Sequence, residues 1–432
     1  MSTPLTAKQL AKLAETISAT LGEAEPLATL RRKAAALADE LPLPDPALER
    51  RWKYFDPRTV PFEEYEPARP SGTQDPAALI ASFRIDPEEY AGIAIQSNAD
   101  VLQAESRAEG LRLAPLDAVP PELRERIAAA YGAAVPFDRS RLIAMHYAFA
   151  RGGLAVVTEP NADVRQPVRV TRWFEGPGQL AAPHTLIIAG PNSRVSVIED
   201  CRSADDAIVV LPVVEILPAP GAEVRYSILH RWGANTYVFG EQRVVTERDA
   251  VFVGLFVATG GRVVKSHIEA SLVGRGSSSE LFGLTLADDH EHVDFYTLQD
   301  HIGPDTRSDL LFKSALKDHA RAVYYGLTRV GLEARNADAN QENRNLLLSK
   351  TAKADSDPVL EILTNNVIRA SHGATAGPVD EEQLFYLQSR GIPRAAAEEM
   401  LVWAFLGEVL DRLPDDALRQ EVIEILQAKL EA

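Results

Sequence analysis

The middle of the chain, from about Leu142 to Ala370, is the feature that most restricts the fold. Helical spacing of apolar residues is absent there, and short runs rich in Val, Ile, Leu and Phe recur instead. Turn residues such as those at 190–193 and 218–221 separate the runs. So many short strands predict a sandwich, a barrel or a β-solenoid. The expected strands include Leu154–Thr158, Val168–Phe174, His184–Ala189, Val195–Glu199, Ile208–Leu217 and Val224–Leu229.

A weak internal repeat favours the solenoid. The run LFGLT at 281–285 recurs as YYGLT at 324–328. This offset of about 43 residues predicts two rungs of roughly 20 residues each. A single rung cannot bury its inward side chains, so stacked rungs form the core and both ends need caps. Helices at the two termini would serve as these caps.

The pattern of helix-like and strand-like segments divides the chain into three parts. Residues 1–140 are expected to form a helical N-terminal domain and linker, because helical patterns there are broken by prolines. Residues 141–370 form the expected β-solenoid core, and residues 371–432 a helical C-terminal domain. In the last part, Asp380 is the expected N-cap of a short helix that Gly391 closes.

Composition and missing motifs exclude several functions. The net charge of -17 argues against a nucleic-acid partner, which requires a basic face. No run is long enough for a membrane span, and the N-terminus does not resemble a signal peptide. The single cysteine, Cys201, allows no intrachain disulfide, so a cytoplasmic protein is expected. No Walker A, G-x-S-x-G, H-E-x-x-H or C-x-x-C motif is present.

Residues 335–391 contain the most distinctive motifs. An Asn-rich run, D-x-N-Q-x-N-R-N-L-L-L-S, starts at Asp338, and P-V-L-E-I starts at Pro358. Two strand-like runs, at 359–363 and 367–370, are separated by a turn. They are followed by S-H-G-A-T-A-G from Ser371, expected as a turn, and by D-E-E-Q-L-F-Y-L-Q-S-R-G-I from Asp380.

These motifs, in this order, resemble the C-terminal signature of the SufB/SufD family, the scaffold subunits of iron–sulfur cluster assembly. The His-Gly pair and F-Y-L-x-S-R-G-I are more similar to SufD than to SufB. The resemblance implies a parallel β-helix between two helical domains. It also implies a non-catalytic scaffold within a SufBCD complex, paired with a SufB-like subunit and docked to a SufC-like ATPase. A homodimer is the expected form when the partner is missing.

The cysteine count limits how this chain could hold a cluster. A conventional iron–sulfur cluster takes about four thiolates, and this chain has one cysteine. No tightly bound cofactor is therefore expected, only a transient cluster shared with the SufB-like subunit. The residues expected to meet the SufB-like subunit or the ATPase are Val367, Arg369, Phe385, Tyr386, Arg390 and Phe405.

His372 is the foremost candidate ligand. It follows a strand in a Ser/Gly/Thr-rich segment, where a side chain can be exposed on a fixed backbone. Neutral imidazole binds iron and copper well. The alternative is a histidine that only hydrogen-bonds its turn. The resemblance implies that His372 faces the SufB-like subunit and helps to hold the nascent cluster. Many SufD sequences have cysteine two residues earlier, where this chain has Ala370.

A second cluster, His290-Glu291-His292-Val293-Asp294, suggests a rival function. Alternate residues of a strand share a face, so His290, His292 and Asp294 could form part of a two-histidine, one-carboxylate iron site. His301 could contribute from the following run. This pattern is the basis of an alternative, a cupin-type or other β-fold mononuclear metal enzyme. The simpler interpretation is a solvated outer face of a rung. SufB/SufD-like chains have a comparable pattern at His292, Asp294 and His301.

Overall fold

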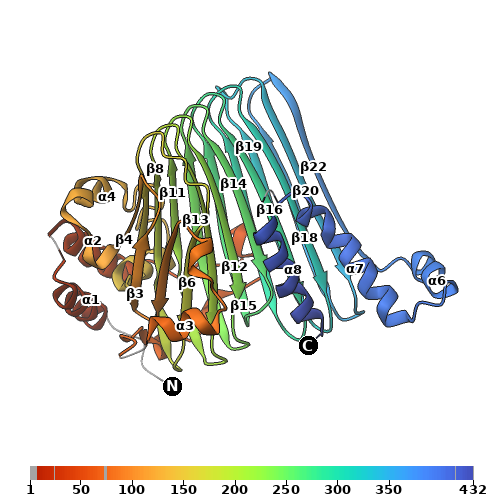
Figure 1. The fold of residues 1–432 in the computed structure, drawn as a ribbon, viewed down its shortest axis with the longest axis horizontal. Helices are drawn as coiled ribbons and strands as arrows, with labels where there is room; N and C mark the ends of the chain where they lie inside the picture. Colours follow the sequence, from red (N-terminus) through yellow and green to blue (C-terminus); the bar gives the residue numbers. More distant parts are fainter. Residues whose placement is uncertain (1–6, 24, 73–74, 414, 432) are drawn as a thin grey trace.

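The computed structural model describes residues 7–23, 25–72, 75–413 and 415–431. Two facing sheets of parallel strands wind into a β-solenoid of about eight turns between residues 154 and 378. Helices lie at both ends of the chain (Figure 1). The prediction of a β-solenoid flanked by helices is therefore confirmed.

Each turn contributes one strand to each sheet, and we name the sheets after their last strands. The β21 sheet contains β4 (Leu111–Pro115), β5 (Leu154–Thr158), β8 (His184–Ala189), β11 (Val213–Pro218), β13 (Thr236–Thr246), β15 (Val263–Leu272), β17 (His292–His301), β19 (Arg321–Val330) and β21 (Lys353–Ile362). Short strands β1 (Glu66–Pro67), β7 (Gln179–Ala181) and β10 (Ile208–Val210) extend it. The β22 sheet contains β2 (Gly92–Ser97), β3 (Asp100–Ser106), β6 (Val168–Phe174), β9 (Arg194–Ser203), β12 (Glu223–Arg231), β14 (Val251–Ala258), β16 (Ser278–Ala287), β18 (Arg307–Leu316), β20 (Ala337–Leu347) and β22 (Val367–Pro378).

The strand register corrects the expected rung length. Val263 pairs with His292, and His292 pairs with Arg321, so one turn takes about 29 residues in this region. The repeat at 281–285 and 324–328 falls on β16 of one sheet and β19 of the other. Its offset is therefore about one and a half turns. The estimate of 20 residues was wrong because each turn consists of two strands of about ten residues and two corners.

One corner of the solenoid is built from stacked residues with left-handed backbone. They are Asn161, Asn192, Gly221, Asp249, Gly276, Asp305 and Asn336, one per turn, with φ between 54° and 74°. Asn, Asp and Gly adopt this conformation at the lowest cost. Each of their N–H groups donates to a carbonyl of the next turn, as from Asn192 to Pro220 (3.0 Å) and from Asp305 to Arg335 (2.8 Å). The corners therefore continue the hydrogen bonding that stacks the strands.

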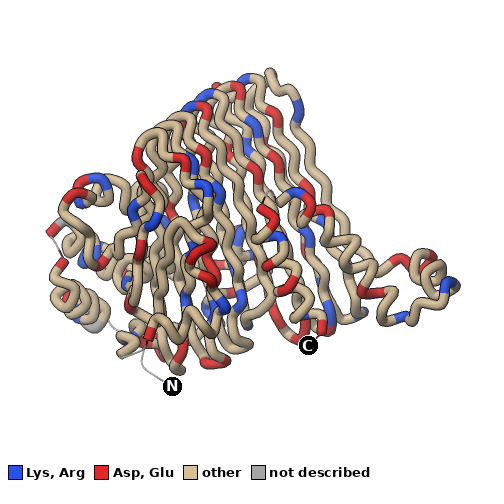
Figure 2. The backbone as a smooth tube through the Cα atoms, in the orientation of Figure 1, with Lys and Arg blue, Asp and Glu red and all other residues tan. Residues whose placement is uncertain are grey.

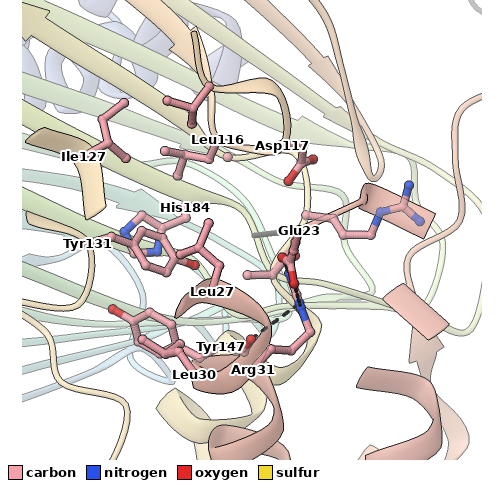
Figure 3. Close-up of a pocket in the computed structure, with 14 residues that line it drawn as sticks. Glu23, Leu27, Leu30, Arg31, Leu116, Asp117, Ile127, Tyr131, Tyr147 and His184 are labelled. Carbon is pink, nitrogen blue, oxygen red and sulfur yellow. Dashed lines mark hydrogen bonds and ion pairs between the residues drawn. The ribbon is translucent and has the colours of Figure 1, made fainter. Parts of the chain in front are cut away.

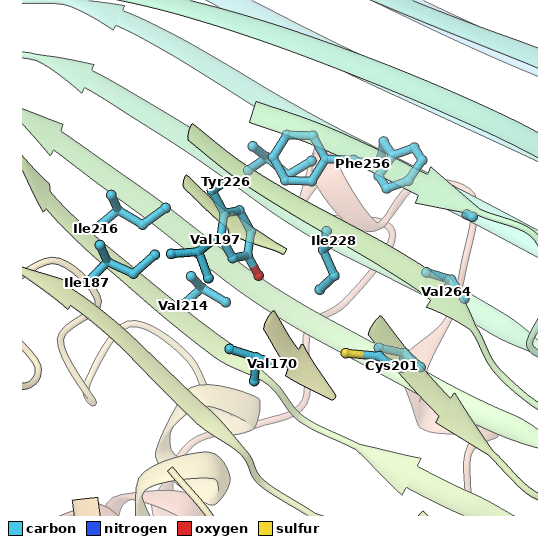
Figure 4. Packing of buried hydrophobic residues seen from close by; sticks show 14 of the residues in the cluster. Val170, Ile187, Val197, Cys201, Val214, Ile216, Tyr226, Ile228, Phe256 and Val264 are labelled. Atoms are coloured by element: carbon cyan, nitrogen blue, oxygen red, sulfur yellow. The ribbon is translucent and has the colours of Figure 1, made fainter. Parts of the chain in front are cut away.

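The space between the two sheets, which we call the lumen, is closely packed with apolar side chains over most of its length (Figure 4). The two repeat glycines leave room for aromatic rings in it. A Cβ added at Gly283 would lie 2.1 Å from Cδ1 of Phe312, which belongs to the neighbouring strand. At Gly326 the closest atom would be the hydroxyl of Tyr324, at 2.2 Å. The motif is therefore a packing feature.

The N-terminal region is more mixed than expected. It contains the helices α1 (Ala7–Leu21), α2 (Glu25–Glu40), α3 (Pro76–Ser82), α4 (Arg124–Ala130) and α5 (Arg141–Phe149), with one-turn 3₁₀ helices at Arg50–Trp52, Pro57–Thr59, Phe62–Glu64, Pro87–Glu89, Leu116–Ala118 and Pro121–Leu123. Strands β2, β3 and β4 also lie here, where only helices were expected, and α5 lies in the stretch expected to lack helices. Antiparallel pairing of β2 with β3 and of β4 with β5 ends both sheets on this side.

The C-terminal helices are α6 (Glu381–Ser389), α7 (Arg394–Leu410) and α8 (Asp416–Glu431). Asp380 caps α6 as predicted, since its carboxylate accepts from the N–H of Glu382 at 2.8 Å. These helices were expected to cap the end of the solenoid, but they do not. Instead α7 and α8 lie against the outer face of the β22 sheet, where residues such as Leu406 and Val422 pack on Phe282 and Leu311. No described helix lies across the open end of the last turn.

Charged residues of both signs are interspersed along the solenoid and the helices, in spite of the net charge of -17 (Figure 2). Among the described residues, no helix combines the length and the apolar character that crossing a membrane requires.

We predict that Gly283→Ala lowers the free energy of unfolding by about 1–3 kcal/mol, because the added methyl group would overlap the buried ring of Phe312. Urea unfolding followed by circular dichroism measures the change. Gly373→Ala is the control, since nothing lies within 4 Å of a Cβ at that position. Equal effects of the two substitutions would contradict this account of the motif.

Candidate functional site at the open end of the solenoid

His372 was expected to lie in a turn, but the structure places it within a strand. Strand β22 runs through Ser371 to Pro378, and His372 pairs in register with Gln341 of β20. Register partners in parallel strands have side chains on the same face. Gln341 is buried in the lumen, so His372 lies on the lumen face of the last strand. His372 is exposed because no further turn covers it.

The lumen becomes polar near His372. Thr328 donates to Oε1 of Gln341 at 3.0 Å, and Nδ2 of Asn345 donates to Oδ1 of Asn343 at 2.8 Å. Asn345 also donates to the hydroxyl of Ser356 (3.1 Å) on β21. One and two turns earlier the corresponding positions carry apolar side chains such as Phe312 and Leu281. Amides and hydroxyls therefore line the mouth of the solenoid, where they can accept or donate hydrogen bonds to a bound group.

The edge at this mouth is open. Among the described strands, β22 pairs only with β20 and β21 only with β19, so one row of backbone N–H and C=O groups on each strand has no strand partner. Three apolar side chains beside this edge are exposed, namely Ile362 (43%), Leu363 (50%) and Ile368 (71%). Soluble proteins usually cover or charge such an edge. This end of the molecule is therefore suited to pairing with another chain.

The two other predicted contact residues on β22 are largely engaged within the chain. Val367 is half-buried and packs against a small cluster formed by Val330, Ala334 and Ala337. Arg369 is half-exposed and its Nε lies 2.8 Å from Oδ1 of Asp338 on β20. Both lie beside the open edge, where a partner that extends the sheet would meet them.

The second predicted contact region is the hairpin formed by α6 and the start of α7, which projects beyond the last strand (Figure 1). Leu384 and Ala397 are fully buried within it, whereas Phe385 is 73% and Tyr386 58% exposed. The guanidinium of Arg390 lies 5.2 Å from the centroid of the Tyr386 ring. These residues form an exposed aromatic patch.

Phe405, further along α7, is placed differently. It is half-buried, its carbonyl accepts from Nζ of Lys313 at 2.7 Å, and that ammonium lies 4.7 Å from its ring centroid. Phe405 therefore fastens α7 to β18 and is less available to another chain than Phe385.

The structure does not assemble the alternative metal site. His290 lies in the corner before β17, where its ring stacks on His319 at 5.0 Å. His292 and His301 are the first and last residues of β17, roughly 30 Å apart at about 3.3 Å per residue. Among the described residues, no group of three or more His, Cys, Asp or Glu side chains could hold a metal ion. The described residues therefore give the cupin-type interpretation no support.

Asp294 and His301 have structural partners instead. Nζ of Lys265 lies 2.7 Å from Oδ2 of Asp294, and both side chains are buried. Burial alone would raise the pKa of Asp294, but the Lys265 ammonium holds it below its usual value. Both ring nitrogens of His301 are hydrogen-bonded to hydroxyls, Nδ1 to Thr306 (2.8 Å) and Nε2 to Ser308 (2.9 Å). Burial lowers the pKa of His301 to about 4.

Cys201 lies in the lumen on β9, among buried apolar side chains (Figure 4), and pairs in register with Arg172 of β6 and His230 of β12. Five strands of the β22 sheet separate β9 from β22, which carries His372. Burial raises the pKa of its thiol well above the usual value. It is therefore a packed, weakly nucleophilic thiol.

A buried polar network at the opposite end of the solenoid, beside the pocket drawn in Figure 3, was not predicted. His146 lies 3.0 Å from Nδ1 of His184, whose Nε2 lies 3.1 Å from Glu215. Backbone N–H groups of 132, 134 and 135 donate to the same carboxylate. The adjoining cavity, lined by Arg31 and Tyr131, has a volume of about 30 Å³, enough for one or two water molecules. This network of hydrogen bonds joins the N-terminal helices to the solenoid.

The polar lumen was also missed, although a signal for it was present. From Ala337 to Asn345, small residues and then amides alternate with polar, mostly charged residues, which is the period of a strand. The alternation was overlooked because its inward residues are not hydrophobic.

Comparison with known proteins shows which protein family this chain resembles. Residues 172–405 match the model described as SUF system FeS cluster assembly, SufBD core domain. An iron–sulfur cluster assembly SufBD family protein of Mycobacterium tuberculosis is 31% identical over 304 residues, 69% of this chain and 75% of the relative. Bacillus subtilis SufD is 28% identical (68% of each chain) and its SufB 25% identical (93% of this chain, 89% of the relative). The similarity does not distinguish SufD from SufB.

The buried state of His301 predicts a pH dependence. Its pKa is about 4 in the folded chain and 6.5 as a free residue, so the unfolded chain binds a proton first. The resulting stability is present above pH 6.5 and is lost as the pH falls towards 4. Between pH 7 and 5 this loss amounts to about 2 kcal/mol.

His301→Gln should lose about 2 kcal/mol less than the unsubstituted chain over this interval, as measured by urea unfolding at both pH values. His290→Gln provides the control, because that side chain is exposed in the corner before β17. If both variants lose as much stability as the unsubstituted chain, His301 is not held neutral by the fold.

Proposed function

The chain belongs to the SufB/SufD family of iron–sulfur cluster assembly proteins, and from this we propose that it is a SufD-like scaffold subunit. Members of this family are generally non-catalytic components of the assembly system. The His-Gly pair at His372 and the sequence F-Y-L-Q-S-R-G-I after Leu384 support the SufD-like assignment. In this proposal the chain pairs with a SufB-like subunit and docks a SufC-like ATPase.

The position of His372 is the observation that carries the proposal. Its imidazole lies on the lumen face of an edge strand, exposed in the single chain and ready to be covered by a second chain. Imidazole is a good ligand for iron, and the neighbouring lumen residues on β22, Ala370 and Ala374, are small and leave space beside it. A partner that stacks on this end would close a compartment with His372 in its wall.

The chain supplies too few ligands to hold a cluster by itself. Its single thiol is buried away from the mouth, and the described residues form no group able to hold a metal ion. The nascent cluster, which is cargo rather than a resident cofactor, would therefore take its remaining ligands from the partner. Ala370 in the position of the SufD cysteine makes this dependence stronger.

The open edge would provide the pairing surface. Backbone groups of β22 can continue the sheet into a strand of the SufB-like subunit, and Ile362, Leu363 and Ile368 would be buried beside it. A second copy of this chain offers the same edge, so a homodimer is the expected form of the isolated protein.

The hairpin would dock the ATPase, and α7 would transmit its movement. The carboxylate of Glu408 on α7 lies 2.5 Å from Nζ of Lys313 on β18 and 3.0 Å from Nη1 of Arg344 on β20. Two strands of the final turns are thereby linked to α7, the helix that follows the docking patch on α6. A displacement of the hairpin would act on the strand that pairs with β22.

We predict that His372→Ala abolishes or strongly reduces cluster formation by the reconstituted complex, while the complex still assembles. The reason is that the substitution removes a ligand without altering the backbone of the edge. Cluster formation is followed by visible absorption, and assembly by size-exclusion chromatography. Thr375→Ala, an exposed residue on the same strand, is the control. Normal cluster formation by the complex that contains His372→Ala would refute the proposal.

Removal of the aromatic patch by Phe385→Ala with Tyr386→Ala should weaken ATPase binding at least tenfold, because exposed aromatic side chains carry much of the affinity of such contacts. Binding is measured by calorimetry with the purified SufC-like subunit. Leu332→Ala removes a side chain of similar exposure (70%) from the solenoid, and binding should be unaffected. A similar affinity for all three proteins would place the ATPase elsewhere.

A further inference from the structure

A groove of about 900 Å³ lies on the outer face of the β22 sheet, far from the open end. One wall is α8 and the other is formed by residues 82–90, which follow α3 (Figure 1). Its floor carries Arg169 of β6, Arg202 of β9 and Arg231 of β12. The volume lies within the range of small-molecule sites, about 300–1,000 Å³.

The floor gathers more positive charge than its own carboxylates balance. Arg202 and Arg231 are direct register partners on adjacent strands, an arrangement that is unfavourable for like charges. Both approach the buried Asp200, at 2.6 Å and 3.4 Å, and Arg169 reaches the same carboxylate at 2.8 Å. Glu421 of α8 accepts two hydrogen bonds from Arg169. Three guanidinium groups thus share two carboxylates.

The arginines are held in place while part of their hydrogen-bonding capacity remains unused. The guanidinium of Arg202 lies 3.9 Å from the centroid of the Phe83 ring. Arg169 is 2% exposed in its side chain, and its buried Nε has no hydrogen-bond partner among the described residues. Burial lowers the pKa of Arg231, Asp200 opposes this shift and Arg202 adds to it. An anion seated between Arg202 and Arg231 would relieve their repulsion.

The walls restrict the remainder of the ligand. The wall formed by α8 carries Glu421 and Glu424, with Asp415 just before the helix, and Glu89 lies on the opposite side. Carboxylates accept hydrogen bonds from hydroxyl or amine groups and repel further negative charge. The rings of Phe83 and Tyr90 add apolar surface to the wall formed by residues 82–90. The matching molecule therefore has one anionic end and several hydrogen-bond donors.

We propose that this groove binds a small organic phosphate of the size of a nucleoside monophosphate, with its phosphate on Arg202 and Arg231. Its hydroxyl and amine groups then face the acidic residues of α8. The site lies on the outer face of the sheet and is independent of His372, so the scaffold function can fail without affecting this inference.

Calorimetry of the purified full chain with AMP tests the proposal, with inorganic phosphate as the second probe. We expect one AMP per chain and weaker binding of phosphate, which cannot reach the walls. Arg202→Gln and Arg231→Gln should each weaken AMP binding roughly tenfold or more, since each removes a charged hydrogen-bond donor. Arg225→Gln is the matched control, because Arg225 lies on the same face of β12 outside the groove.

Absence of binding at millimolar AMP overturns the inference, as does an equal loss in Arg225→Gln. If inorganic phosphate binds as tightly as AMP, the groove does not recognise the organic part of the ligand, and that part of the proposal is refuted. If either groove variant fails to fold by circular dichroism, hydrogen exchange of the unsubstituted chain decides. AMP must then slow exchange in residues 82–90 and in α8, and unchanged exchange there refutes the site.

Discussion

The structure depends on the hydrogen bonding of each turn to the next, through parallel strands and through stacked corners. Every internal strand has both backbone edges occupied, and the corner residues from Asn161 to Asn336 continue the same bonding. Such a fold has no intrinsic end, because each turn exposes the groups that the next turn would bind. At the N-terminal side, antiparallel strands complete the sheets. No described strand completes them at β21 and β22, and the open edge on which the proposed pairing depends is a direct consequence.

The change of the lumen from apolar to polar gives this edge chemical character. Apolar side chains pack around Phe312 in the middle of the solenoid, whereas Gln341, Asn343 and Asn345 form hydrogen-bonded amides within two turns of the mouth. Buried amides are stable only when they are hydrogen-bonded, and here they bond to one another and to Ser356. His372 therefore lies above an ordered polar surface. The helix α7 is tied to the same turns through Glu408, so one short region combines the pairing edge, the histidine and the link to the hairpin.

The outer face of the β22 sheet shows how one fold can present two unrelated surfaces. Towards the C-terminus it is apolar and covered by α7 and α8, while β6, β9 and β12 carry arginines on the same face. The ion pair between Arg169 and Glu421 connects the two regions, because it holds α8 against the solenoid beside the groove. Burial of such a pair in good geometry restricts how the helix can sit, more than it adds net stability.

The sequence alone determined the class of fold, the absence of a thiol set, and the family, because strand-forming runs, residue counts and ordered motifs are local properties of the chain. A close look would also have yielded the length of a turn, since an Asn, Asp or Gly suited to left-handed backbone recurs about every 29 residues from Asn161 onward. The face of β22 on which His372 lies, the separation of His292 from His301, and the meeting of Arg202 with Arg231 were decided only by tertiary structure. A strand alternates its side chains between two faces. Which residues become neighbours therefore follows from the register between turns, and that register is fixed only when the whole solenoid stacks.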